Sequence, residues 1–234
     1  MPQTVNDVHA LQDALVRDAG YQVRPPLVGS DAHRAGIEAA LDQLATVSTS
    51  ATVLFYYSGH GEVRHDGTRD HYYLLPHGYD PARHDDTCLP SQEVTERLLR
   101  IPARLLIAFF DCCHAAGQFK GSAGAKRVSA PDDLVAALGH GGRFVMSSSQ
   151  SSEKSYVGDR LSVFTECLIA GLRGGNGACL DRRTGAVTLL RLAEYLVREV
   201  PQRARELRAP GPQTPVLRNA SNLGCEPIAR PRPP

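Results

Sequence analysis

One apolar run with an abrupt chemical ending constrains the fold of this chain more than any other feature. The run extends over six residues from Leu105 to Phe110 and is followed directly by Asp111, Cys112 and Cys113. Runs of this length, rich in branched and aromatic side chains, are typical of a strand buried on both faces of a parallel sheet. In open α/β sheets the reactive groups lie just beyond the carboxyl ends of such strands. We therefore expect the chemistry of this protein at the end of this strand.

A second segment has the same design. Residues 52–57 form an apolar run that leads, after Ser58, to a histidine, His60, flanked by glycines. If the two strands are parallel neighbours, His60 and Cys113 meet at one edge of the sheet. A thiol attacks only as a thiolate, so it needs a neighbouring base such as an imidazole. This pairing is the arrangement used for nucleophilic catalysis by cysteine.

The glycine after the histidine, Gly61, adds a further element of the predicted site. Because glycine has no side chain, its backbone N–H can approach a substrate carbonyl closely. Together with the N–H of Cys113 it would form an oxyanion hole, in which each donor contributes about 3 kcal/mol in known enzymes. The alternative is a buried structural cysteine and a histidine satisfied in a loop. The matched endings of the two apolar runs favour the catalytic interpretation.

The remaining chain alternates helical and strand patterns. Helices are predicted at 6–19, 31–44, 90–100, 132–138, 161–172 and 189–200, and strands at 21–23, 52–61, 72–75, 104–113, 143–146 and 215–217. Polar loops are predicted at 77–88 and 117–131, and a disordered tail or linker at 219–234. Strands that alternate with helices in this way imply a mainly parallel sheet with helices on both faces, a three-layer αβα fold.

Composition excludes several classes of function. The chain has 234 residues, 42% hydrophobic and 22% charged, with a formal net charge of +1, which gives no reason to expect nucleic acid or an anionic membrane as a partner. No apolar run approaches the roughly 18 residues that span a bilayer, and the polar start shows no export signal. The six cysteines form no C-x-x-C pair, so neither a disulfide scaffold nor a metal site is indicated. We expect a cytoplasmic protein.

Two motifs carry a resemblance to a known family. The segments 57–61 (Tyr-Ser-Gly-His-Gly) and 111–115 (Asp-Cys-Cys-His-Ala) closely resemble the catalytic motifs of the caspase-like cysteine peptidases, and the nearest branch is that of the metacaspases and their bacterial relatives. The histidine and cysteine lie about 50 residues apart, as they do in caspases. The resemblance covers about residues 4–218. It implies a cysteine endopeptidase in which His60 is the general base and Cys113 the nucleophile, with no cofactor required.

The resemblance also implies a substrate preference. The acidic specificity pocket of the family maps onto Asp7, Ser58 and Asp111. Two carboxylates in one pocket select a long cationic side chain. We therefore expect cleavage of proteins or peptides after Arg or Lys, rather than after Asp as in true caspases.

The family pattern further divides the chain into parts. It implies a large-subunit-like part at 1–117, a linker loop at 118–131, a small-subunit-like part at 132–218 and a Pro/Arg-rich tail at 219–234. The linker is basic, so self-cleavage there is one interpretation and an ordinary solvated loop is the other. The Pro-rich end is consistent with fusion to other domains or activation by other proteins.

Two departures from the family pattern bear on the site. Asp85 and Asp86 resemble a carboxylate pair that binds activating calcium in some metacaspases, but other expected acids are missing and calcium requires six or more oxygens. A solvated loop is therefore preferred to a calcium site. The family also has an apolar strand just before the helix at Asn6, and residues 1–5 are too few to supply it. Either the sheet has a gap or the strand belongs to residues outside this sequence.

Two other functions remain open on the sequence. The first is a catalytically inactive caspase-like scaffold that binds a partner. The second is a hydrolase of a different thioester or amide on the same sheet. Selective labelling of Cys113 by a peptidyl-Arg electrophile separates the first from a peptidase, and a positional peptide library separates the second.

Overall fold

The computed structural model describes residues 2–68, 70–114, 142–150, 153–219 and 225–231. The loop predicted at 117–131, which contains the whole proposed linker at 118–131, and the helix predicted at 132–138 lie outside the described residues. The subunit-like division of the chain therefore stays a prediction.

The described residues form alternating helices and strands, as the periodicity of the sequence predicted. The helices are α1 (Pro2–Arg17), α2 (Arg34–Gln43), α3 (His84–Thr87), α4 (Ser91–Leu99), α6 (Val163–Leu172) and α7 (Leu189–Glu206), with short 3-10 turns at Gly29–Ala32, Leu44–Thr46, Pro81–Arg83 and Gly175–Gly177. The strands are β1 (Thr52–His65), β2 (Asp70–Leu75), β3 (Leu89–Pro90), β4 (Leu105–His114), β5 (Arg143–Ser147), β6 (Val187–Thr188), β7 (Val216–Asn219) and β8 (Pro227–Ala229).

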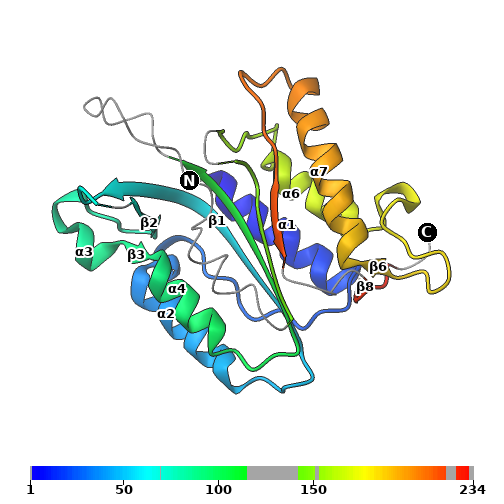
Figure 1. The fold of residues 1–234 in the computed structure, drawn as a ribbon, viewed down its shortest axis with the longest axis horizontal. Helices are drawn as coiled ribbons and strands as arrows, with labels where there is room; N and C mark the ends of the chain where they lie inside the picture. Colours follow the sequence, from blue (N-terminus) through cyan, green and yellow to red (C-terminus); the bar gives the residue numbers. More distant parts are fainter. Residues whose placement is uncertain (1, 69, 115–141, 151–152, 220–224, 232–234) are drawn as a thin grey trace.

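The main sheet has the strand order β3-β2-β1-β4-β5-β7, and its three central strands β1, β4 and β5 are parallel. The outer strands β2, β3 and β7 pair antiparallel to their neighbours. Helices α1, α6 and α7 cover one face of the sheet, and α2 and α4 cover the other (Figure 1). The protein therefore has the predicted three-layer αβα architecture, with a parallel centre and antiparallel edges.

Strand β4 lies at the centre of the core. Its side chains alternate between the two faces, as the two-residue period of a strand requires. Phe109 belongs to the cluster under α1, α6 and α7, where its ring lies 6.0 Å from Phe144 and 6.1 Å from Phe164, while Phe110 belongs to the cluster under α2 and α4. Residues 105–110 are buried throughout, which confirms that this run is a strand covered on both faces.

Strand β1 is less buried than its sequence predicts. Its residues 54–57 are only half-buried, although they are as apolar as those of β4. The reason is its neighbours, since β1 pairs with β4 along residues 52–61 but with β2 only along residues 60–65. The strand predicted at 21–23 is wrong, because this segment has no neighbouring strand with which to pair. Helix α1 begins at Pro2, so no described strand precedes it.

Two segments predicted to lack structure are ordered. Residues 77–88 contain a 3-10 turn and α3, with His84 buried against the ring of Tyr73 at 4.5 Å. In the tail, Pro227–Ala229 form β8, which pairs with β6 and buries Ile228. The expectation of a disordered tail is therefore wrong for this part, because burial of an apolar side chain anchors it. No helix in the described ranges is long and apolar enough to cross a membrane.

Candidate active site

The carboxyl end of β4 and the later part of β1 bring the two predicted catalytic residues together along the backbone; β1 continues past His60 to His65, where it pairs with β2, so the strand predicted to end at residue 61 is longer. The strands are parallel neighbours, and their register makes His60 and Cys113 direct Cα partners. Adjacent strands lie about 4.8 Å apart, so the two residues are immediate neighbours along the backbone. Two residues earlier in the same register, Ser58 is the partner of Asp111. The catalytic roles of His60 and Cys113 stay predictions.

The environment of His60 suits a base. The residue as a whole is exposed, but its ring is partly shielded by its neighbours, and this desolvation lowers the pKa of the imidazole below its usual 6.5. The neutral form, which can accept a proton, therefore predominates near neutral pH. The Tyr57 hydroxyl lies between the carbonyl oxygens of His60 and of its β2 partner Leu75, at 3.1 Å and 3.2 Å, and its hydrogen bonds hold these two backbone segments in position.

Gly61 has a packing reason to be glycine as well as the predicted role in the oxyanion hole. It continues β1 between Leu74 and His114 and is buried. A Cβ atom at this position would lie 2.3 Å from the Tyr72 hydroxyl oxygen, much closer than real Cβ contacts. A side chain here would have to displace the phenol ring of Tyr72. In this register the N–H groups of Gly61 and Cys113 face the neighbouring strand of the β1–β4 ladder. Their use as an oxyanion hole therefore requires the two strands to separate at this point, and it stays a prediction.

Three buried thiols elsewhere in the described residues are poor candidates for the nucleophile. Burial raises the pKa of Cys88 to about 11 and those of Cys167 and Cys179 to about 12. These thiols stay protonated at neutral pH, and a protonated thiol is not a nucleophile. Cys112, the neighbour of Cys113, is buried and forms no disulfide.

The three residues predicted for the specificity pocket lie together beside this edge. Asp7 on α1 is 1% exposed and Asp111 on β4 is 4% exposed. The Ser58 hydroxyl donates to Oδ2 of Asp7 at 3.1 Å, and the backbone N–H of Ser162 donates to Oδ1 of Asp7 at 2.8 Å. Two buried carboxylates thus lie in one hydrogen-bonded cluster between β1, β4, α1 and the start of α6, at the place of the predicted specificity pocket.

A ring of hydroxyl groups surrounds Asp111, and sequence reasoning missed all of its members. Ser155 donates to Oδ1 at 2.6 Å, Thr165 donates to Oδ2 at 3.1 Å, and Ser162 also donates to Oδ2. Tyr56 lies behind this ring, 2.5 Å from the Thr165 hydroxyl. Only Ser162 could have been singled out from the sequence, because a serine before a helix is a common N-cap. In the structure its hydroxyl accepts from the N–H of Thr165 at 3.1 Å.

A buried glutamine supports the ring from behind. Gln213 is fully buried, and its side-chain amide donates to the Ser155 hydroxyl at 3.2 Å and to the Ser148 carbonyl at 3.1 Å. Its carbonyl oxygen accepts from the N–H of Tyr156 at 2.9 Å. The segment before β7 therefore fixes the chain around Ser155, which in turn contacts Asp111.

The charge of this pocket depends on pH. Burial raises the pKa of Asp7 to about 6; the N–H of Ser162 acts in the opposite direction, and the charge of Asp111 adds to the rise. Among the described residues, no lysine, arginine or histidine forms an ion pair with Asp7 or Asp111. Buried charges are normally paired, whereas these two carboxylates are held by hydroxyl and N–H donors alone. Their role in substrate selection stays a prediction.

We expect the Asp7→Asn variant to be more stable than the wild type above pH 6. The folded pKa lies above the ordinary 3.8, so the folded state holds this proton more tightly. Protonated Asp7 therefore stabilises the wild-type fold fully below about pH 4, and this stabilisation is lost as pH rises to about 6. The loss corresponds to about 3 kcal/mol in the free energy of unfolding. Urea unfolding at pH 4 and pH 8 measures it, with Asp13→Asn on the exposed face of α1 as the control. An equal loss of stability at both pH values would contradict this expectation.

Asp85 and Asp86, the acids considered for calcium, lie on α3 and are not part of the cluster around Asp7 and Asp111. The side chain of Asp85 is 98% exposed and its carboxylate contacts His84 at 3.0 Å. Within the ranges that the structure describes, no group of three or more His, Cys, Asp or Glu side chains could hold a metal ion. The calcium site stays a prediction without structural support.

The fold and this edge define a three-layer α/β domain of the kind found in caspase-like peptidases. The family model described as the caspase domain of the C14 peptidases matches residues 1–222. The chain therefore belongs to the caspase-domain family of cysteine peptidases.

Solved structures agree in fold. A protein from Geobacter sulfurreducens is 18% identical with a TM-score of 0.64, over 99% of this chain and 91% of its own. Caspase-1 from Spodoptera frugiperda is 17% identical with a TM-score of 0.59, over 93% of this chain and 79% of its own. No curated protein matches the sequence. At these identities the likeness supports the fold alone.

Proposed function

We propose that this protein is a cysteine endopeptidase that cleaves protein substrates after arginine or lysine. One observation carries the proposal. Two buried carboxylates, Asp7 and Asp111, have no described cationic partner and lie beside the sheet edge where His60 and Cys113 are register partners. A cationic substrate side chain in this pocket would place its own carbonyl group near the cysteine.

The proposed reaction uses only groups of the chain and water. His60 takes the proton of the Cys113 thiol, and the thiolate attacks the carbonyl carbon of the basic residue. Where the two strands separate, the N–H groups of Gly61 and Cys113 leave the β1–β4 ladder and stabilise the oxyanion that forms. The C–N bond breaks, and the amine leaves with the proton held by His60. Water, deprotonated by His60, then cleaves the thioester and releases the new carboxylate.

The chemistry of the pocket favours arginine or lysine over aspartate. An aspartate side chain would meet two buried carboxylates, and like charges in a low-dielectric site repel strongly. A guanidinium or ammonium group instead supplies the missing countercharge. Because Asp111 accepts from three hydroxyl groups, its oxygens are fixed in position before a substrate arrives. The pocket would therefore bind a cation with little reorganisation.

A panel of fluorogenic peptides tests the proposal. The peptides carry Arg, Lys or Asp before the scissile bond and are otherwise identical. We expect the wild type to cleave the Arg and Lys peptides and the Cys113→Ala variant to cleave none. Parallel assays with calcium and with a chelator test the calcium dependence. Cleavage of the Asp peptide, or turnover by Cys113→Ala, would contradict the proposal.

Self-cleavage within 118–131 is a separate consequence of the same specificity. This segment contains Lys120, Lys126 and Arg127. Incubation of the wild type and the Cys113→Ala variant, followed by mass mapping of fragments, tests it. Cuts after these basic residues in the wild type alone would support self-processing, and intact chains in both would count against it.

The affinity for basic substrates should rise with pH. Below pH 6 Asp7 is protonated and the pocket holds one negative charge fewer, so we expect KM for an Arg peptide to fall as pH rises through about 6. The Asp7→Asn variant should lose this transition in KM while the rise of kcat that depends on His60 remains. Stopped assays from pH 5 to pH 8 measure both quantities. If the Asp7→Asn variant kept the transition in KM, a group other than Asp7 would be responsible for the transition.

A further inference from the structure

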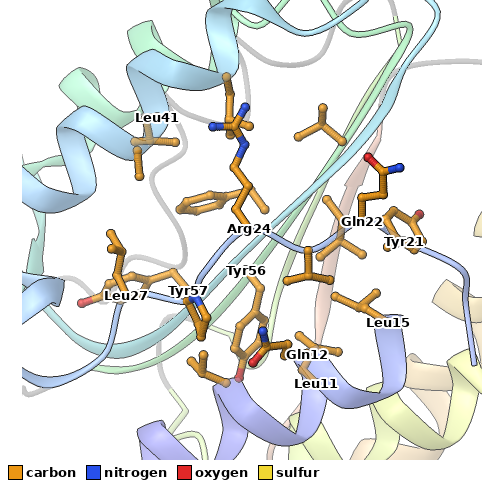
Figure 2. A pocket seen from close by; sticks show the side chains of 18 of the residues that line it. Leu11, Gln12, Leu15, Tyr21, Gln22, Arg24, Leu27, Leu41, Tyr56 and Tyr57 are labelled. Atoms are coloured by element: carbon orange, nitrogen blue, oxygen red, sulfur yellow. The ribbon is translucent and has the colours of Figure 1, made fainter. Parts of the chain in front are cut away.

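Tyr57 lies on the face of β1 opposite to the predicted catalytic histidine. Consecutive side chains of a strand point to opposite faces of the sheet. Tyr56 packs against the core under α1, α6 and α7, and Tyr57 packs against the core under α2 and α4 (Figure 2). By the same two-residue period His60 belongs to the face of Tyr56. The ring of Tyr57 is therefore behind the strand that carries the imidazole.

The hydroxyl of Tyr57 reaches back to the strand backbone. It donates to the carbonyl oxygen of His60 at 3.1 Å and to that of Leu75, the register partner of His60 on β2, at 3.2 Å. Burial raises the pKa of Tyr57 well above its usual 10, so the phenol keeps the proton that these hydrogen bonds require. One side chain thus joins β1 to β2 at the first pair of their ladder.

Gly59 makes room for this arrangement. A Cβ atom on Gly59 would lie 2.6 Å from the Tyr57 hydroxyl oxygen and 2.7 Å from Cζ of the same ring, much closer than real Cβ contacts. A side chain at residue 59 would therefore push the hydroxyl away from the carbonyl of His60. Tyr57, Gly59 and His60 form one structural unit, in which the glycine is required by the tyrosine.

The carbonyl that Tyr57 holds belongs to the peptide group that carries the Gly61 N–H. This peptide is trans, as are the others among the described residues, so its C=O and N–H point in opposite directions. The C=O of His60 faces Tyr57 and β2, which directs the N–H of Gly61 towards β4 and Cys113. When β1 and β4 separate at this point, the hydrogen bond from Tyr57 keeps the peptide group with β2 and preserves the direction of its N–H.

We propose that Tyr57 is a positioning residue, which holds the His60–Gly61 peptide group so that the Gly61 N–H is presented to the oxyanion of the substrate. The proposal rests on the proposed peptidase function, because the oxyanion forms only during acyl transfer. Stabilisation of a developing charge requires donors that are fixed before the reaction. The Tyr57 hydroxyl donates to backbone oxygens, so its loss should slow the chemical step without changing substrate affinity.

The Tyr57→Phe variant, which keeps the ring and removes the hydroxyl, tests the proposal. On an Arg peptide we expect kcat to fall about tenfold with KM unchanged, in line with the loss of one hydrogen bond. The pH dependence of Cys113 alkylation by iodoacetamide should stay that of the wild type. A peptidyl-Arg aldehyde, whose oxygen becomes the oxyanion when the thiolate adds to its carbon, should bind about tenfold more weakly, since its complex needs the same donor. The corresponding peptidyl alcohol should bind as before.

Two further variants make this result specific. Tyr79→Phe is the matched control, because the Tyr79 hydroxyl also forms two hydrogen bonds with β1, to Glu62 at 3.0 Å and from Arg64 at 3.2 Å, and it should keep wild-type kcat. Gly59→Ala should lose kcat as Tyr57→Phe does, and the double variant should lose little more, because both changes break the same contact.

The outcomes separate this role of Tyr57 from the peptidase function itself. In an active wild type, an unchanged kcat in Tyr57→Phe, or an equal loss of affinity for the aldehyde and the alcohol, would overturn the proposal. A wild type that cleaves no peptide would instead refute the peptidase function. The residual dipolar coupling of the Gly61 amide, which reports the direction of its N–H, then decides the role of Tyr57. A coupling unchanged in Tyr57→Phe would overturn it.

Discussion

The His60→Ala variant is expected to lose about 10²- to 10⁴-fold in kcat on an Arg peptide, with KM little changed. General acid–base catalysis contributes this much when a positioned imidazole transfers the proton. His60 is the register partner of Cys113, and partial burial already keeps its pKa below 6.5. The thiol of the variant would have to ionise without a neighbouring base. Steady-state assays from pH 6 to pH 9 measure the loss, which should shrink at high pH as the thiol ionises unaided.

Matched variants make this result specific. His65→Ala changes a histidine on the same strand whose ring contacts Asp70 at 2.9 Å, and it should keep wild-type kcat. In the double variant His60→Ala/Cys113→Ala the loss should equal that of Cys113→Ala alone, because residues that act as one unit are not additive. If the chain were an inactive scaffold, a peptidyl-Arg electrophile would not label Cys113 of the wild type selectively. If the His60→Ala variant kept a near-normal kcat, the imidazole of His60 would not be the general base.

The part of the site that could be predicted depends on local signals. Each apolar run has one direction and one end, so Asp111 and His60 could be placed just beyond two apolar runs from the sequence alone, although β1 continues to His65 and β4 to His114. The α/β pattern predicted a mainly parallel sheet, but that these two strands are neighbours was only assumed from the sequence and is shown by the register. The resemblance to a family then brought Asp7 into the same pocket, which the hydrogen bond from Ser58 supports. No periodicity in the sequence places α1 against these strands.

The part that could not be predicted depends on distant contacts. Ser155 and Gln213 contact each other across 58 residues of sequence, and nothing in either local sequence indicates a partner. The strand predicted at 21–23 fails for the same reason, because its apolar pattern is local but a strand requires a neighbour. In the opposite direction, β8 forms from a Pro-rich segment because Ile228 is buried beside β6. Tertiary pairing overrides local propensity in all three places.

The Asp111→Asn variant is expected to lower kcat/KM for Arg and Lys peptides by about 10²- to 10³-fold, mainly through KM. Truncating one partner of a buried charge interaction typically costs 2–5 kcal/mol. The amide keeps the shape of the carboxylate but removes its charge. Its NH₂ group would also face hydroxyl donors, since Ser155, Ser162 and Thr165 all donate to Asp111. The variant should therefore lose both the countercharge and the fixed geometry of the pocket.

A second measurement keeps this prediction testable if the variant is less stable. Alkylation of Cys113 by a small uncharged reagent needs the His60–Cys113 pair but not the pocket, so its rate should stay near that of the wild type. Ser155→Ala, which removes one donor and leaves the charge, should raise KM by roughly tenfold, in line with the loss of one hydrogen bond to a charged group. If Asp111→Asn keeps both its alkylation rate and its preference for Arg, the cation must be bound elsewhere. In that case the two buried acids would be structural, and the substrate preference would have to come from residues outside this pocket.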